Sequence, residues 1–164
     1  MLPRVSYCGH TLYDMNNIDK PFDLRRAVVA GLAGSAAYLA EQYVDLKLLR
    51  YPGDDLKLLG MIATRRAPYW QLAGLANHFA NGTALAVVYA LLLRNRLPGS
   101  PVVRGLLMGQ LENALLWPSV PLVIDPYHPA IKAGALPRLN TPVYAAQAVL
   151  RHVAYGAVLG WVYD

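Results

Sequence analysis

Two histidines occupy equivalent places in the two halves of this sequence. His78 and His152 each lie ten residues after a proline and four residues before a glycine, which is Gly82 in the first half and Gly156 in the second. Residues four apart share one face of a helix. Imidazole is a standard axial ligand of haem iron, bundle helices often hold cofactors, and glycine leaves room for a flat ring. The pattern therefore predicts a haem b held by both histidines, or a chlorin whose magnesium binds one of them.

Two further polar residues fall at the same predicted depth as the histidines. Glu112 and Tyr38 each lie ten residues into an apolar segment, and ten helical residues rise about 15 Å, half the thickness of a bilayer core. An ionisable side chain at this depth is costly unless it faces other helices or water. We therefore expect a polar layer inside a helical bundle. Its centre comprises Tyr38, His78, Glu112 and His152, and its flanks comprise Asn77, Asn81, Asn113, Gln147 and Arg151.

The polar layer admits three other interpretations. Its side chains can be hydrogen-bonding groups that join the helices, with Glu112 paired to Arg151. Alternatively, His78, His152 and Glu112 can bind a metal ion, with Tyr38 as a further ligand, because two histidines and one carboxylate form a known iron site. The third interpretation is a proton or ion path through Glu112, the histidines and Arg151.

Known catalytic motifs are absent, and no catalytic residue is predicted. The sequence has no G-x-S-x-G, phosphate loop, HExxH or CxxC pattern. A role other than catalysis is therefore favoured. Cys8 is the single cysteine, which excludes an internal disulfide framework and a cysteine-based zinc site.

Four segments are long and apolar enough to be predicted as membrane spans. They cover residues 27–46, 69–93, 102–124 and 143–162, against a need for roughly 20 residues per span. Hydrophobic residues make up 55% of the chain and charged residues only 15%. The net charge of +5 fits arginines at membrane edges better than a nucleic-acid surface. We expect an all-α integral membrane four-helix bundle over residues 27–164, preceded by a polar arm over residues 1–26.

The sequence also contains an internal repeat. Residues 28–89 align without gaps with residues 102–163, and the identical pairs include Gly31/Gly105, Pro68/Pro142 and His78/His152. Each repeat is then a helical hairpin, and two tandem hairpins of the same orientation make a parallel repeat. The loops 47–67 and 125–142 lie on one membrane face. We expect a short interfacial helix in the first, with Asp54 and Asp55 at its charged edge, and an irregular second loop.

The second half of each repeat resembles small bacterial four-span proteins of the YagU-like inner-membrane type. The resemblance rests on HFANGTALAVVYALLL and HVAYGAVLGWVYD, where a histidine, a glycine four residues later and a closing tyrosine recur. It implies a small multi-span membrane protein and brings no catalytic residues.

The function expected from these observations is that of an accessory subunit in a larger respiratory or photosynthetic membrane complex, with haem or a chlorin at the histidine pair. The alternatives are a stand-alone bis-histidine haem b electron-transfer protein, and a proton or ion transporter or metal-binding protein that uses Glu112 and the histidines. Expected partners are the lipid bilayer and other membrane subunits or further copies of the chain, and not nucleic acid. The expected location is a bacterial inner membrane, with both termini in the cytoplasm.

Overall fold

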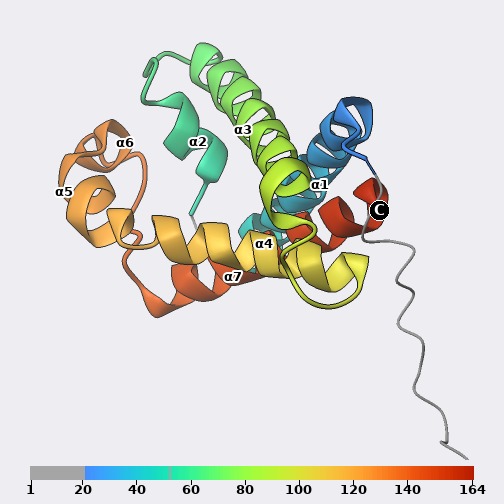
Figure 1. Cartoon of the computed structure of the whole chain (residues 1–164). Coiled ribbons are helices and arrows are strands. Elements are labelled where there is room, and N and C mark those ends of the chain that lie inside the picture. Colours follow the sequence, from blue (N-terminus) through green and yellow to red (C-terminus); the bar gives the residue numbers. More distant parts are fainter. Residues whose placement is uncertain (1–20, 52) are drawn as a thin grey trace, which may run out of the picture.

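The structure is a computed structural model that describes residues 21–51 and 53–164, and every regular element in these ranges is helical. The four long helices are α1 (Leu24–Val44), α3 (Tyr69–Val88), α4 (Pro101–Leu116) and α7 (Pro142–Tyr163). The short ones are α2 (Asp55–Gly60), α5 (Asp125–Tyr127) and α6 (Pro129–Lys132), and π-helical turns form η2 (Asp45–Leu49), η3 (Tyr89–Leu93) and η4 (Val120–Ile124) (Figure 1). The all-α prediction is confirmed.

The predicted arm lies mostly outside the described residues, and so does Cys8. The last three residues of the predicted arm, 24–26, form the first turn of α1. Asp23 begins this helix because its carboxylate accepts a hydrogen bond from the backbone N–H of Arg26 at 3.0 Å. Thr141 begins α7 in the same way, accepting from the N–H of Tyr144.

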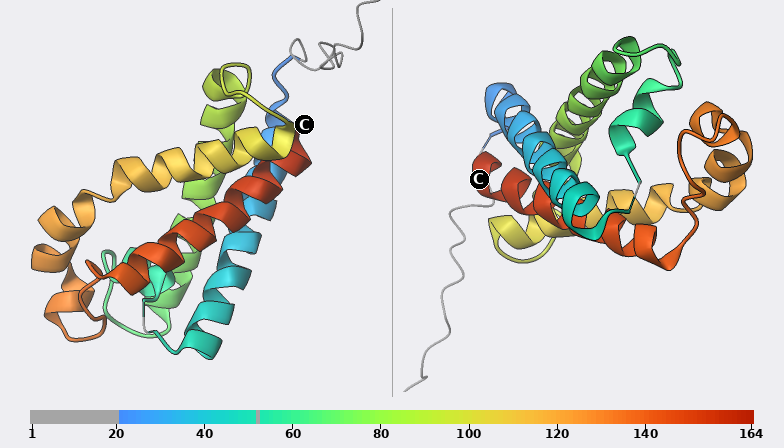
Figure 2. Two further views of the ribbon diagram at one scale, coloured as in Figure 1. Left: turned by 90° about the horizontal axis from the view of Figure 1, so that it is seen from below. Right: turned by 180° about the vertical axis from the view of Figure 1, so that it is seen from behind.

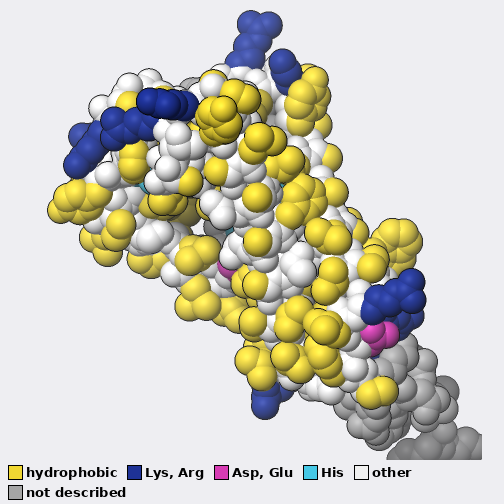
Figure 3. Space-filling model, turned by 90° about the horizontal axis from the view of Figure 1, so that it is seen from above, with side chains coloured by type: hydrophobic (Ala, Val, Ile, Leu, Met, Phe, Trp, Pro, Cys, Tyr) yellow, Lys and Arg dark blue, Asp and Glu magenta, His cyan; other side chains and the backbone are white. Residues whose placement is uncertain are grey.

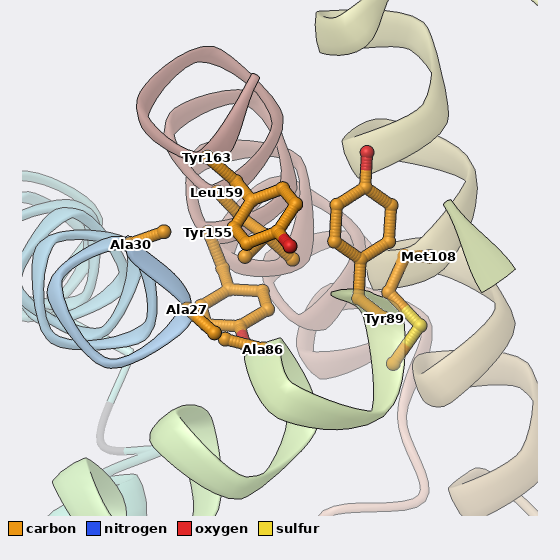
Figure 4. Packing of buried hydrophobic residues seen from close by; sticks show 8 residues of the cluster. All are labelled: Ala27, Ala30, Ala86, Tyr89, Met108, Tyr155, Leu159 and Tyr163. Carbon is orange, nitrogen blue, oxygen red and sulfur yellow. The ribbon is translucent and has the colours of Figure 1, made fainter. Parts of the chain in front are cut away.

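The long helices form an open rather than a closed bundle. Helix α3 packs on α1, α1 packs on α7, and α7 packs on α4, whereas the described residues of α3 and α4 make no extended contact. These two helices diverge from a common end near η3 (Figure 1), and the views of Figure 2 show the same separation. At the common end an apolar core holds all four helices together (Figure 4). It comprises Ala27, Ala30, Ala86, Tyr89, Met108, Tyr155, Leu159 and Tyr163.

The two halves of the chain build helix contacts at residues that are equivalent in the repeat. A Cβ atom at Gly31 would come closer than 3.0 Å to the carbonyl oxygen of Gly82, and one at Gly105 would do the same at Gly156. The short helices α2 and α6 begin at residues 55 and 129, which the repeat also aligns with each other. The sequence repeat is therefore visible in the structure, because equivalent glycines allow the close helix contacts in both halves.

The first long loop contains the expected short helix, α2, and this helix folds back along α3. Gly60 lies against the backbone of Trp70, and Gly74 lies against the backbone of Leu56, so glycines permit the close approach. The second loop carries α5 and α6 rather than irregular structure alone, and α2 and α6 meet in an apolar cluster formed by Met61, Ala130 and Leu136 with their neighbours.

Among the described residues, one helix is long and apolar enough to cross a membrane. It runs over Tyr69–Leu93, that is, α3 with η3. Helix α4 ends after 16 residues, α1 includes Glu41, and α7 includes Arg151 and His152. Helix length and apolarity alone therefore establish one candidate span and not the four that the sequence predicts.

Candidate functional site

A cavity of about 290 Å³ lies between α3 and α4, where the two helices fail to pack. Leucines of α2 and α3 line one wall, and α4 and η4 line the other. Helices α1 and α7 contribute Tyr38, Tyr144, Ala148 and Tyr155. The polar side chains that reach the cavity besides these tyrosines are Ser35, Asp55, His78, Asn81, Glu112, Asn113, Ser119 and His152.

The four residues predicted to form the central polar layer lie together. The ring of Tyr38 is next to both histidines, with centroid distances of 5.0 Å to His78 and 5.3 Å to His152. The carboxylate of Glu112 approaches His152, with 4.0 Å between Oε2 and Nε2. Of the flanking residues, Asn113 lines the cavity, whereas Asn77 turns away and donates to the carbonyl oxygen of Leu59 at 3.4 Å.

Each histidine uses one ring nitrogen in a hydrogen bond to a backbone carbonyl. His78 Nε2 lies 3.0 Å from the oxygen of Ser35, and His152 Nδ1 lies 2.6 Å from the oxygen of Ala148. A carbonyl oxygen only accepts, so these two nitrogens carry the protons. In a neutral His152 the other nitrogen, Nε2, is therefore an acceptor that faces Glu112.

This arrangement does not fit the predicted bis-histidine haem. The Tyr38 ring adjoins both imidazoles, and Nε2 of His78 is engaged with Ser35 rather than exposed to a ligand. The predicted ring space at the two glycines is filled by neighbouring helices, because Gly82 lies against Ser35 and Gly156 lies against Gly105. These glycines serve helix contact, which corrects the role assigned to them from spacing.

The predicted metal site does not assemble either. Residues 21–51 and 53–164 contain no group of three His, Cys, Asp or Glu side chains placed to hold a metal ion. Glu112 stands 4.0 Å from His152, and the ring that both histidines contact is that of Tyr38. The His78, His152 and Glu112 triad is therefore corrected to a histidine–carboxylate pair with a separate histidine.

Arg151 is the centre of a second polar cluster and not, as its position along the helix predicts, a flanking residue of the central layer. Its side chain is fully buried, with Nε donating to Asp45 at 2.9 Å and Nη1 donating to Asp55 at 2.7 Å. Glu41 adds a third carboxylate, 3.6 Å from Nε. The expected pair of Arg151 with Glu112 does not form, because Arg151 points to α1 and α2.

Asp55 links this cluster to the cavity. Its carboxylate accepts hydrogen bonds from the hydroxyls of Tyr38 at 2.7 Å and Tyr144 at 2.6 Å, besides Arg151. Its backbone N–H donates to the side chain of Gln42 at 3.2 Å, which holds the start of α2 inside the bundle. Asp55 is therefore buried, and not the interfacial charge that was expected. Arg151 could have indicated this buried position from the sequence, because an arginine within an apolar helix requires an acidic partner.

Glu112 has no basic partner among the described residues. Its side chain is 10% exposed and accepts one hydrogen bond, from Asn81 at 3.5 Å. No lysine or arginine in the described ranges forms an ion pair with it. The site thus combines a cluster of paired charges around Arg151 with a cavity-wall carboxylate that faces a histidine and an asparagine but no basic side chain.

The chain belongs to a protein family of unknown function, DUF6789, whose model matches residues 22–164. The match covers all four long helices, both loops and the cavity between α3 and α4. Neither a curated protein nor a solved structure matches the chain.

Proposed function

We propose that this chain is an integral membrane protein in which α1, α3, α4 and α7 cross the bilayer, and in which the cavity binds a small, largely apolar molecule. The observation that carries the first part is the inverted distribution of polarity. Arg151, Asp45 and Asp55 are buried, whereas leucines on every long helix are exposed. A protein surrounded by water has the opposite arrangement.

The exposed apolar side chains follow the outer faces of all four helices. Leu32, Leu75, Leu111 and Leu150, one on each, are 40–50% exposed. Figure 3 shows hydrophobic side chains along the length of the molecule, with Lys and Arg gathered toward its two ends. Such a band between charged ends matches the apolar thickness of a bilayer and its two interfaces. The turn and η4 that follow α4 extend this helix to Ile124, which lengthens it to the scale of a span.

The second part of the proposal follows from the composition of the cavity wall. Binding sites for small molecules are concave, mostly apolar, and carry a few polar groups that orient the ligand. The cavity has this composition, with leucines and Trp117 around Glu112 and His152. Its position between helices of a bundle is also a common place for ligands.

Trp117 provides a direct test, because it lines the cavity. We expect the neutral probe para-bromophenethyl alcohol to quench the fluorescence of the detergent-solubilised protein along a saturable curve. Trp117→Phe should remove the saturable component of the quenching. Ala148→Leu should weaken binding, because its larger side chain occupies part of the cavity. Val153→Leu is the matched control, since Val153 lies on the exposed face of the same helix. Quenching that rises linearly and equally in all variants would reject a binding cavity.

The role of an accessory subunit is independent of the cavity and stays a prediction. The apolar outer faces fit lipid and the helices of a larger complex equally well. The haem prediction is tested by the absorption spectrum of the purified protein with and without dithionite. Sharp reduced bands that vanish in His78→Ala would restore it against the geometry described above.

A further inference from the structure

We infer that the ligand of the cavity is an organic cation, a protonated amine with an apolar body, and that Glu112 is its counter-ion. This inference rests on the proposed function. It names the class of ligand, and it comes from comparing the cavity with the interface that is its symmetry counterpart.

The internal repeat relates α1 to α4 and α3 to α7. A strictly two-fold bundle would therefore pack α3 on α4 in the way that α7 packs on α1. In the structure α7 packs on α1 along the length of the helices, whereas the cavity lies between α3 and α4. The cavity is thus the open counterpart of a closed helix interface within the same molecule.

The closed interface contains both signs of charge. Arg151 of α7 meets Glu41 and Asp45 of α1 and η2, and Asp55 of α2 completes the cluster. The repeat equivalent of Arg151 on α3 is Asn77, which is neutral and points to Leu59. The repeat equivalent of Tyr38 on α4 is Glu112. The repeat equivalents of Glu41, Asp45 and Asp55 are neutral as well, namely Leu115, Ser119 and Pro129. The open side therefore keeps one acid, Glu112, and no cation to pair with it.

Asn81 donates to the Glu112 carboxylate, whereas the other groups near it favour positive charge. Nε2 of His152 is an acceptor, because the ring proton resides on Nδ1 against Ala148. An ammonium group has three N–H donors, which can reach both this nitrogen and the carboxylate. The aromatic ring of Tyr38 adjoins His152, and aromatic faces attract cations. Asp55, which lines the cavity from α2 and is paired with Arg151, is a second carboxylate that disfavours an anionic ligand.

The test compares three probes of one shape but different charge: para-bromophenethylamine, para-bromophenethyl alcohol and para-bromophenylacetate. Quenching of Trp117 reports binding of each probe at one mildly alkaline pH. In the unaltered protein we expect the amine to bind at least about tenfold more tightly than the alcohol, since hydrogen bonds between charged groups are stronger than those of a neutral hydroxyl. The acetate should bind more weakly than the alcohol.

Glu112→Gln keeps the shape of the side chain and removes its charge. We expect it to abolish the preference for the amine while leaving the affinity for the alcohol within about twofold. Glu41→Gln is the matched control, because Glu41 is a carboxylate of the same bundle that does not line the cavity. This variant should keep the preference for the amine.

The outcomes separate this inference from the proposed function. Saturable binding of the alcohol without a preference for the amine, or a preference that survives Glu112→Gln, overturns the organic cation and leaves the cavity as a neutral site. Failure of all three probes to saturate overturns the proposed function itself. Should Glu112→Gln not fold, the order of amine, alcohol and acetate in the unaltered protein still decides the sign of the ligand.

Discussion

At the scale of single residues, Arg151 is the side chain on which the buried polar groups depend. It lies between Asp45 of η2 and Asp55 of α2, and so it joins the end of the first helix to the loop that folds back into the bundle. Removing one partner of a buried ion pair leaves the other charge uncompensated, which is far more costly than losing a surface pair. The cluster around Arg151 is therefore where a single substitution should act most strongly.

We predict that Arg151→Leu lowers the free energy of unfolding by about 3 kcal/mol or more. Unfolding of the detergent-solubilised protein by added sodium dodecyl sulfate measures the change. Arg65→Leu is the control, because Arg65 is exposed, and it should have little effect. Adding Asp45→Asn to Arg151→Leu should recover part of the loss, since the stranded carboxylate is then neutral. No recovery in the double variant would contradict the pairing.

His128 offers a second residue-scale test, at the loop end of the molecule. Nδ1 of His128 accepts a hydrogen bond from the N–H of Ala130 at 3.1 Å and so begins α6. Burial lowers the pKa of His128 below its ordinary value of 6.5. The unfolded chain therefore binds a proton at higher pH than the folded chain does. The stability contributed by the neutral ring is present above pH 6.5 and is lost as the pH falls through the lowered pKa.

We predict that His128→Asn removes this acid dependence while it keeps the helix start, because asparagine also accepts a hydrogen bond from the first turn. The measurement is the free energy of unfolding at about pH 8 and about pH 5, on either side of the ordinary histidine pKa. The unaltered protein should lose stability between these values by more than the variant does. An identical loss in both would show that other groups cause the acid sensitivity.

The sequence predicted part of the site because residue depth can be counted along a helix. Tyr38, His78, Glu112 and His152 meet, as counting ten residues into each apolar segment predicts. The pairing of charges could not be predicted in this way. Asp55 lies in a loop, and only the return of α2 along α3 brings it to Arg151. That return depends on close backbone contact at the glycines of α2 and α3, for which the sequence offers no periodic signal.

At the scale of elements, glycines determine how closely the paired helices approach. Gly156 of α7 lies against the carbonyl group of Gly105 on α4, and Gly82 of α3 lies against Ser35 of α1. Small residues at helix contacts are the main way in which membrane helices pack, since lipid provides no hydrophobic driving force between them. The same residues in the two halves suggest that each hairpin is built as one unit.

We predict that Gly156→Leu separates α4 from α7 and destabilises the protein by about 2 kcal/mol or more, because the added side chain meets backbone atoms that cannot yield. Gly82→Leu should act in the same direction on α1 and α3. Resistance to unfolding in sodium dodecyl sulfate measures both. Val153→Ala on the exposed face of α7 serves as the control and should be nearly neutral. Tolerance of Gly156→Leu would mean that α4 and α7 are not in contact.

At the scale of the whole molecule, the repeat accounts for the elements but not for the shape. It predicts two similar hairpins, and equivalent glycine contacts and loop helices are present. The relation between the hairpins is asymmetric because one inter-hairpin contact is closed around Arg151 and the other stays open. The residues at equivalent places on the two sides differ in charge, and so the sequence contains the cause of the asymmetry without revealing its extent.

The proposed four spans would also fix which parts of the chain share a side of the membrane. The turn between η3 and α4 contains Arg96 and lies at the end where α1 begins, whereas Arg66 lies in the loop at the opposite end. With Cys8 replaced by serine, Arg96→Cys and Arg66→Cys each provide a single reactive thiol. We predict that a membrane-impermeant maleimide added to sealed, right-side-out vesicles labels one of them, and that permeabilisation is needed to label the other. Labelling of both from one side would reject four spans.

A protein with the Tyr69–Leu93 helix as its single span would still place Arg66 and Arg96 on opposite sides, so Arg138→Cys is needed as well. Two further crossings by α4 and α7 put Arg138 on the same side as Arg66, whereas a single span leaves it with Arg96. We therefore expect the thiols at positions 66 and 138 to react under the same conditions and the thiol at position 96 under the opposite ones. Because the loops that contain Arg66 and Arg138 meet through α2 and α6, this result would also place that apolar contact at one membrane surface.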